Sequence, residues 1–233
     1  MTFTSLASSS RGNAYVVSDG ETTLLLECGL SFKELQKRLG YGVAGITACL
    51  VSHEHQDHAK AAAQLLKSGV PVYMSEGTAA AHKDAMDAAH LIKAGDVLRF
   101  GHLTVVPFRT FHNTDEPLGF LIEDRRTGER LLWAVDTANL GVTADKLTYI
   151  AVECNYEERL LNRSDRIPSV LKDRIRHSHF EVSDVIRWLH KQDLSGVLTI
   201  WLLHLSAGNS RAEAWQVRFE REFPGIEIRV CPE

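Results

Sequence analysis

Three histidines and one aspartate lie within six consecutive positions, in the stretch HEHQDH from His53 to His58. In an extended segment, side chains two positions apart point to the same side, so His53 and His55 can bind one ion together. The chain then turns into a helix that begins near Ala59, which directs Asp57 and His58 toward a second position nearby. Mixed imidazole and carboxylate ligands suit zinc, manganese or iron better than calcium. The stretch therefore predicts two neighbouring divalent-metal sites.

The alternative is a solvated, histidine-rich turn on the surface. HEHQDH is internal, however, and it follows directly on the apolar run ACLVS, which is typical of a buried strand. Open α/β folds place their functional groups in loops after the carboxyl ends of strands, and this loop has that position. Two ions so close together need further ligands, including a carboxylate that both share.

Length and composition limit the kind of protein. The chain has 233 residues, is 44% hydrophobic and carries a formal net charge of -4. We predict a single domain over residues 1–233, because the chain shows no repeat, linker or low-complexity segment. No apolar run approaches the roughly 20 residues of a membrane span, and the N-terminus lacks the blocks of a signal peptide. The cysteines form no CxxC pair, and we expect free, mostly buried thiols in a cytoplasmic protein without a membrane partner.

Apolar runs rich in Val, Leu and Thr predict strands in the first third of the chain, at 13–19, 21–28, 47–52 and 70–75. Helices are expected at 31–40, 59–69 and, as one Ala-rich helix, 77–90. Four further strands are expected at 96–100, 103–111, 118–124 and 130–136. The last third predicts helices at 167–177, 182–192 and 211–222, and strands at 196–206 and 225–231. Two strand-rich halves carrying helices predict an α/β (α+β) protein, with two mixed sheets packed face to face and helices outside.

HEHQDH matches the HxHxDH signature of the metallo-β-lactamase superfamily, and the resemblance covers nearly the whole chain. Further pieces follow in the order expected of its YycJ/WalJ-type branch, namely SLASSSRGNAYVV, LLLECGLS, FHNTDEPLGF, AVDTAN, VECNYEERLL and LLHLSAGNSRAE. The resemblance implies an αββα sandwich with a metal centre along one edge of its sheets. Members of this branch are described as DNA exonucleases.

The resemblance also implies that three distant residues complete the metal centre. His112 would join the first two histidines of HEHQDH in the first site, and His204 would join Asp57 and His58 in the second. Asp136 would be the carboxylate shared by both ions. Each of the three lies at or just past the end of an apolar run. Taken singly, each would more often be a structural or surface residue, but together with HEHQDH they complete a ligand set.

Candidates for catalysis and substrate binding follow partly from the resemblance. His179 matches a family histidine and is a candidate to orient the scissile phosphate or protonate the leaving oxygen. Asp57 is a candidate to steer the attacking water as well as a ligand. Asn155 matches a family position near the site, with a turn role as the alternative. Arg174 and Arg176 belong to a basic run before His179 and are candidates to bind phosphate, the alternative being a solvated helix face.

Three stretches depart from the family's usual pattern. Glu27, in LLECG, stands where an aspartate usually braces the metal loop, AVDTAN replaces a TDTG-like turn, and HSHFE replaces a Gly-His-Leu-Ser stretch. The remaining histidines lie in helical or turn contexts and are expected to be exposed, namely His82, His90, His102 and His190.

Two ions with a shared carboxylate would hold a water between them and lower its pKa from about 15.7 toward neutrality, giving a bridging hydroxide. We therefore expect a dinuclear hydrolase using zinc or manganese, with DNA or a small phosphodiester as substrate and exonuclease activity as the leading hypothesis. The alternative is a small-molecule metallohydrolase, such as a lactonase, thioesterase or cyclic-nucleotide phosphodiesterase. A non-enzymatic binding module is a third hypothesis, which the filled ligand positions disfavour. Oligomeric state is left open.

Overall fold

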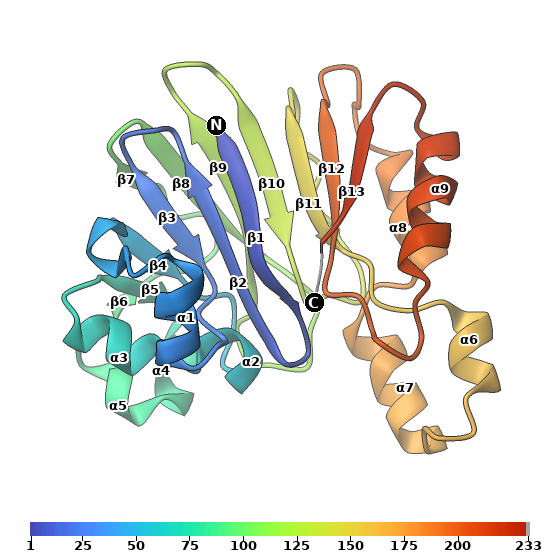
Figure 1. Cartoon of the computed structure of the whole chain (residues 1–233), viewed down its shortest axis with the longest axis horizontal. Coiled ribbons are helices and arrows are strands. Elements are labelled where there is room, and N and C mark those ends of the chain that lie inside the picture. Colours follow the sequence, from blue (N-terminus) through green and yellow to red (C-terminus); the bar gives the residue numbers. More distant parts are fainter. Residues whose placement is uncertain (232–233) are drawn as a thin grey trace. The chain divides into compact units, whose positions relative to one another are not determined.

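The computed structural model describes residues Met1 to Cys231, except for the side chain of Met86. The chain divides into two compact units (Figure 1). The first contains Met1–Arg109 and Thr114–Gly128, and the second contains Thr110–Asn113 and Glu129–Cys231. The strands belong to two mixed sheets of six and seven strands, which confirms the predicted α/β class. The single domain over residues 1–233 stays a prediction.

The first unit contains the whole six-stranded sheet, whose strands follow one another in chain order: β1 (Thr2–Ser9), β2 (Gly12–Ser18), β3 (Thr23–Leu26), β4 (Ala48–Leu50), β5 (Val72–Met74) and β6 (His90–Leu91). Strands β1 to β3 are antiparallel, and β3 to β6 are parallel. Leu26 of β3 pairs with Leu50 of β4. Because parallel strands end at the same edge, the loops that carry Glu27 and His53 start side by side.

Short helices cover this sheet: α1 (Phe32–Arg38), η1 (Val43–Gly45), α2 (Gln56–Ala59), α3 (Ala62–Lys67), α4 (Glu76–Ala81) and α5 (Lys83–Met86). Leu35 of α1 and Leu65 of α3 are buried in one core with Leu25 and Val72 of the sheet. The first unit also contains an antiparallel meander of three strands of the other sheet, β7 (Leu98–Phe100), β8 (Leu103–Arg109) and β9 (Leu118–Asp124).

The prediction of one continuous helix over 77–90 is wrong. Two helices, α4 and α5, are separated at His82, whose φ of -113° and ψ of 72° are not helical. Residues His90–Leu91 form strand β6. Alanine-rich composition favours a helix, but a tertiary hydrogen bond from the His82 side chain, described below, overrides this local preference.

In the second unit, four parallel strands are paired in the order β13 (Glu227–Val230), β12 (Thr199–Leu203), β11 (Tyr149–Glu153) and β10 (Arg130–Ala134). Ala134 pairs with Val152, and Glu153 pairs with Leu203. The loops that follow β10, β11 and β12 therefore leave the sheet at one edge, and they carry Asp136, Asn155 and His204. All five residues of β12 are buried, as expected for a parallel strand covered on both faces.

The helices of the second unit are α6 (Glu158–Arg163), α7 (Ser169–Ser178), α8 (Val182–Leu189) and α9 (Ala212–Glu222). Helix α9 packs beside β13 and buries Trp215 and Phe219 (Figure 1). The sequence predicts α7 to α9 with nearly the observed bounds, but it does not predict β1, β11 or α6. The four cysteines are buried free thiols, which confirms that prediction. Among the described residues, no helix is long and apolar enough to cross a membrane.

Candidate metal centre

The loop HEHQDH, which follows β4, assembles four predicted ligands within the first unit. His53 Nε2 lies 3.0 Å from His55 Nδ1, so both imidazoles direct a nitrogen to the same place. The ring centroids of His53 and His58 are 4.1 Å apart, and His58 Nε2 lies 3.4 Å from Asp57 Oδ2. His55 is the N-cap of α2, so the helix begins at Gln56, within the stretch, and not near Ala59 as predicted.

Glu27 and Ser52 hold two of these imidazoles from behind. The Ser52 hydroxyl is hydrogen-bonded to His53 Nδ1 at 2.8 Å, which leaves Nε2 to face His55. Glu27 Oε1 accepts the Ser52 N–H at 3.1 Å, and Glu27 Oε2 lies 3.6 Å from His58 Nδ1. Burial raises the pKa of Glu27. The longer carboxylate at this position thus still braces the metal loop, as partners behind a metal ligand commonly do.

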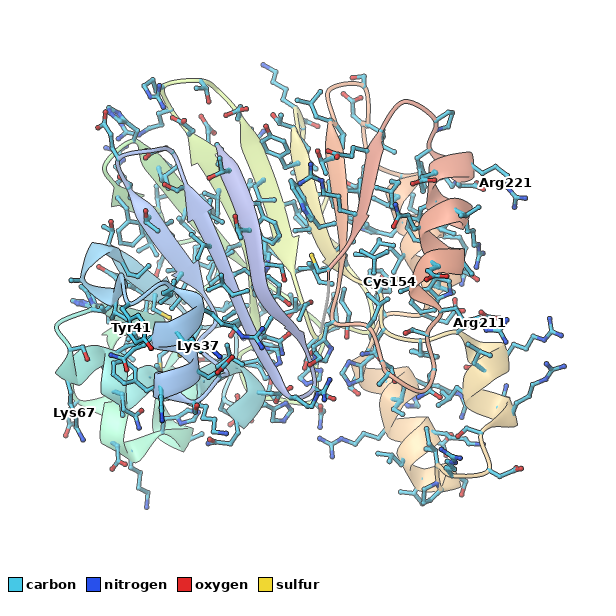
Figure 2. All side chains as sticks on the ribbon, in the orientation of Figure 1. Lys37, Tyr41, Lys67, Cys154, Arg211 and Arg221 are labelled. Carbon is cyan, nitrogen blue, oxygen red and sulfur yellow. The ribbon has the colours of Figure 1, made fainter. Side chains whose placement is uncertain are left out.

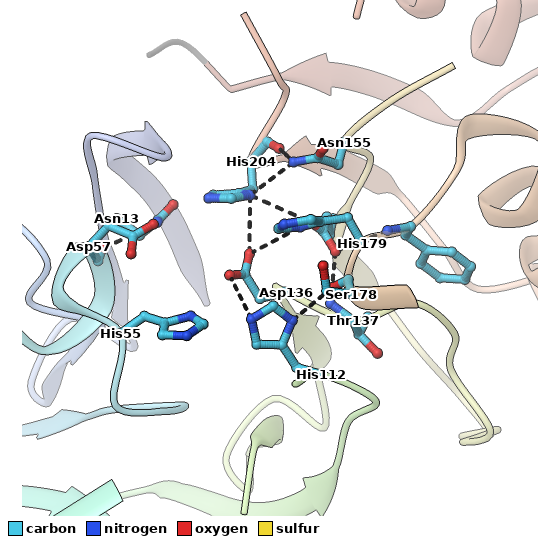
Figure 3. Close-up of polar contacts among 12 residues, drawn as sticks. Asn13, His55, Asp57, His112, Asp136, Thr137, Asn155, Ser178, His179 and His204 are labelled. Carbon is cyan, nitrogen blue, oxygen red and sulfur yellow. Dashed lines mark hydrogen bonds and ion pairs between the residues drawn. The ribbon is translucent and has the colours of Figure 1, made fainter. Parts of the chain in front are cut away.

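Asn13 and Gly29 support the same loop, and the sequence did not single out either of them. Asn13 Nδ2 lies 3.2 Å from Asp57 O (Figure 3). It is also 3.2 Å from His58 Nε2, and the Tyr15 hydroxyl donates to Asn13 Oδ1 at 3.0 Å. A Cβ added at Gly29 would lie 1.6 Å from Asp57 O, so only glycine fits under the loop. Both residues lie in pieces that carry the family resemblance, RGNAYVV and LLLECGLS.

His82 reaches the metal loop from outside it. Its Nε2 is 2.8 Å from the backbone carbonyl oxygen of Glu54, the residue between His53 and His55. The N–H donor at Nε2 stabilises this carbonyl and holds the loop between the two ligands. The side chain is therefore half-buried and bonded, so the expectation that His82 is an exposed histidine is wrong.

Replacing His82 by Phe is expected to weaken the affinity for the first divalent ion by about tenfold, since outer partners of metal ligands typically contribute about 10–100-fold. Phe keeps the ring but cannot donate to the Glu54 carbonyl. The measurement is a calorimetric titration of the metal-stripped protein with zinc. The control is His102→Phe, at a half-exposed position of the same unit. Equal affinities for the two variants would contradict a positioning role.

In the second unit, His112 is oriented by the end of helix α7. Its Nδ1 donates to the carbonyl oxygen of Ser178 at 2.8 Å, and its Nε2 lies 3.5 Å from Asp136 Oδ2 (Figure 3). Burial lowers the pKa of His112, although the Asp136 carboxylate opposes this. A neutral imidazole with Nδ1 occupied by a carbonyl presents the Nε2 lone pair, which is the form that binds metal ions.

Asp136 and His204 lie together beside this histidine. Asp136 Oδ1 is 3.1 Å from His204 Nδ1, so the carboxylate has an imidazole near each oxygen. Asn155 holds His204: its Nδ2 donates to the His204 carbonyl oxygen at 2.8 Å and lies 3.2 Å from Nδ1. Asn155 itself is buried, with 6% of its surface exposed.

Glu153 is the functional residue that the sequence missed in this unit. Its Oε1 is 2.6 Å from His179 Nδ1 and 3.3 Å from His204 Nδ1. Its Oε2 accepts the backbone N–H groups of Thr137 and Phe180 at 2.8 and 3.2 Å. The sequence does contain a feature that could have identified it: Glu153 is the single charged residue, at the end of the otherwise apolar strand YIAVE. A charged side chain is rarely fully buried without partners, so its position suggests a functional contact.

Glu153 and His179 form a largely buried carboxylate–imidazole pair, joined through Oε1 and Nδ1. Burial acts to raise the pKa of Glu153, but attraction to His179 outweighs it, and that pKa lies below its ordinary value. Burial acts to lower the pKa of His179, but the Glu153 carboxylate outweighs it and raises that pKa. His179 is also the more accessible of the two, with 19% of its side chain exposed.

Backbone strain gathers at residues of both clusters. Glu27, Asp136 and His204 have positive φ angles of 65°, 46° and 52°. Such a conformation is unfavourable for a residue with a side chain and costs on the order of 1–3 kcal/mol, so it persists where the surrounding structure requires it. Here it turns carboxylates and an imidazole at the ends of β3, β10 and β12 toward their partners.

The chemistry of the donors fits divalent transition metals. In the second unit, Asp136, Glu153, His179 and His204 each offer one ligand atom, and these atoms lie within 4.8 Å of one another. In the first unit, imidazole nitrogens converge beside Asp57. Buried sets of imidazoles and carboxylates without thiolates suit zinc, manganese or iron.

The predicted phosphate ligands lie on helix α7 and differ in their surroundings. Arg176 makes hydrogen bonds to Glu158, and Arg174 is exposed at the helix surface. His177 is also exposed, and its Nδ1 bonds the Asp173 carbonyl oxygen at 2.7 Å. Of the two histidines in HSHFE, only His179 lies in the cluster.

The comparison with known proteins agrees with this fold. A family model described as a β-lactamase superfamily domain matches residues 22–200. The chain belongs to this superfamily and is a hydrolytic enzyme with the metallo-β-lactamase fold. It is similar to the metallo-β-lactamase fold protein YhfI from Bacillus subtilis, with a TM-score of 0.72 and 16% identity over 98% of this chain and 95% of that one.

Relatives found by sequence similarity identify the branch of the family. The chain is 30% identical over 229 residues to the exodeoxyribonuclease YycJ of Bacillus anthracis, covering 91% of this chain and 84% of the relative. It is 26% identical over 247 residues to the exodeoxyribonuclease WalJ of Streptococcus pneumoniae serotype 2 (strain D39), covering 97% and 89%. The predicted family and branch are thereby confirmed.

Proposed function

We propose that the protein is a dinuclear metal-dependent phosphodiesterase that degrades DNA as an exonuclease. The observation that carries the proposal is that all seven predicted ligands lie in clusters already assembled within their own units. The proposed first site contains His53, His55 and His112, the second contains Asp57, His58 and His204, and Asp136 is shared by both. The exodeoxyribonuclease names of the two relatives support DNA as the substrate.

Zinc or manganese ions bound by these residues would lower the pKa of water and offset the charge that develops on the phosphate. The chain's own groups fix the imidazoles in advance: Ser52 holds His53, Ser178 holds His112 and Asn155 holds His204. Such preorganisation avoids reorienting the ligands during the reaction. Asp57 is proposed as a ligand that also orients the attacking water.

His179 is proposed as the group that protonates the leaving oxygen. Glu153 binds its Nδ1, and within the described part of the chain its Nε2 has no hydrogen-bond partner in the protein. The ring therefore can hold a proton on Nε2 while the carboxylate stabilises the cationic form. This pairing is the usual way in which a carboxylate orients a catalytic histidine.

The other residues predicted to bind substrate differ in whether they are exposed or bonded to other protein groups. Arg174, which is exposed, is proposed to bind a substrate phosphate. Asn155 and Arg176 are hydrogen-bonded to other protein groups. We propose that they act on the substrate indirectly: Asn155 positions His204, and Arg176 positions helix α7.

The test is to strip the protein of metal, reload it with zinc or manganese, and incubate it with end-labelled single- and double-stranded DNA. A small phosphodiester, bis(p-nitrophenyl) phosphate, is assayed beside them, and the metal-free protein is the control. Metal-dependent shortening from one end is expected and would define the polarity. Two bound ions with cleavage of a lactone, thioester or cyclic nucleotide but not of DNA would overturn the exonuclease in favour of a small-molecule metallohydrolase.

A further inference from the structure

Helices α6 and α7 form a hairpin whose base is part of the second unit's cluster. At the end of α7, the Ser178 carbonyl accepts the His112 Nδ1–H, and His179 bonds Glu153. At the start of α6, the Glu158 N–H is hydrogen-bonded to Glu181 Oε1. The hairpin, the pair of helices at the lower right in Figure 1, thus extends directly from groups that we propose act on the substrate.

Arg176 binds two of the three acidic residues within 158–178, and the third, Asp165, is exposed in the loop between the two helices. Its guanidinium bonds Glu158 Oε1 at 3.0 Å from Nη2 and Asp173 Oδ1 at 2.7 Å from Nη1. It also donates to Asn162 Oδ1 at 2.7 Å, which ties α7 to α6. Lys172 donates to the Asn162 carbonyl oxygen at 3.1 Å. One arginine therefore occupies two carboxylates and fixes the two helices together.

The other arginines of the hairpin remain at its surface. Arg159, Arg163, Arg166 and Arg174 are exposed, and in the part of the chain that the structure describes none of them has a carboxylate within ion-pairing distance. The spacing of Arg159 and Arg163 places both on one face of α6. Residues 158–178 carry six Lys and Arg against three Asp and Glu, so these exposed guanidinium groups leave the hairpin surface with excess positive charge.

We propose that this hairpin binds the phosphate backbone of a nucleic-acid strand that leads to the metal centre. This proposal rests on the proposed function, and it identifies the surface that binds the substrate. Guanidinium groups bind phosphate oxygens in pairs of hydrogen bonds. Residues 158–178 contain no Phe, Tyr or Trp, so the hairpin lacks the large aromatic side chains on which the bases of a single strand usually stack. It contacts phosphates rather than bases, and binding is independent of sequence and strongly dependent on salt.

The experiment compares two variants that each lose four positive charges. The hairpin variant carries Arg159→Gln, Arg163→Gln, Arg166→Gln and Arg174→Gln. The control carries Lys37→Gln, Lys67→Gln, Lys191→Gln and Arg221→Gln, four exposed positions outside residues 158–178, of which Figure 2 labels Lys37, Lys67 and Arg221. Binding of a fluorescent single strand with nuclease-resistant phosphorothioate linkages is measured by anisotropy at several salt concentrations, and hydrolysis of bis(p-nitrophenyl) phosphate is followed in parallel.

The slope of log K against log salt is expected to become shallower by about 3 in the hairpin variant, since each phosphate contact on a single strand contributes about 0.7. Affinity for the strand at low salt is expected to fall at least tenfold, and to fall by more than the rate of hydrolysis of the small ester. The control is expected to keep most of the slope. Equal slopes in the two variants would overturn the proposal.

A third variant separates phosphate binding from an apolar docking role. Val170 and Leu171 on α7 are 80% and 43% exposed, and the variant replaces both by Ser. If this change, and not the loss of the arginines, abolished DNA binding, phosphate recognition by the hairpin would be wrong. If the wild-type enzyme bound the strand through the hairpin but cleaved no DNA, the exonuclease proposal would fail while this inference stood.

Discussion

Replacing Asp136 by Asn is expected to lower kcat/KM for a phosphodiester by at least about a thousandfold. The Asp136 carboxylate has an imidazole nitrogen near each oxygen, His204 at 3.1 Å and His112 at 3.5 Å, and we propose that it is shared by both ions. Asn has nearly the same size but only one neutral oxygen for a metal. Metal ions contribute several kcal/mol to hydrolysis, and each 1.36 kcal/mol is about tenfold in rate.

The kinetics are measured together with metal content by mass spectrometry, so that loss of an ion can be told from loss of rate. Asp145→Asn, at an exposed position of the same unit, is the control and is expected to behave as the wild type. An Asp136→Asn enzyme that kept two ions and more than a tenth of the activity would contradict the shared role of this carboxylate.

Replacing Gly29 by Ala is expected to have the largest effect on stability. The new Cβ would lie 1.6 Å from Asp57 O, 2.1 Å from Asp57 C and 2.7 Å from His58 N. All three atoms are backbone, so no side chain can rotate away, and the metal loop itself must move. Overpacking commonly costs about 1–3 kcal/mol, and a clash with fixed backbone is expected at the upper end or beyond.

Urea unfolding of the metal-free protein measures the stability, and zinc titration measures whether the displaced loop still binds. Gly45→Ala is the matched control, because a Cβ there meets no atom within 4 Å. It is expected to change the free energy of unfolding by about 0.5 kcal/mol or less, as surface substitutions usually do. Similar stabilities and zinc affinities for the two variants would show that the loop does not depend on the close approach at Gly29.

The arginines of α7 show a limit of sequence reasoning. Arg174 and Arg176 lie two positions apart in one basic run, and nothing in the sequence separates them. In the structure, Arg176 reaches Glu158 and Asn162 on α6, whereas Arg174 is exposed without such a partner. The difference depends on which face of α7 packs against α6, and a helix that the sequence did not predict supplies both partners.

The sequence by itself predicted the candidate ligands of HEHQDH, because they are contiguous and the turn from strand to helix after β4 is a local event. It also determined most elements with long apolar patterns, such as β12 and α8. The distant candidate ligands His112, Asp136 and His204 came from the family resemblance, since each taken alone looks like an ordinary structural or surface residue.

Only the tertiary structure decided which residues hold those ligands. Asn13 reaches Asp57 across 44 positions, and Ser178 reaches His112 across 66. Glu153 reaches His179 across 26, and His82 reaches the Glu54 carbonyl across 28. No local pattern in the sequence encodes such pairs, because they form only when parallel strands bring their loops to one edge of a sheet. At His82, a hydrogen bond to a distant loop interrupts a segment whose alanine-rich composition favours one continuous helix.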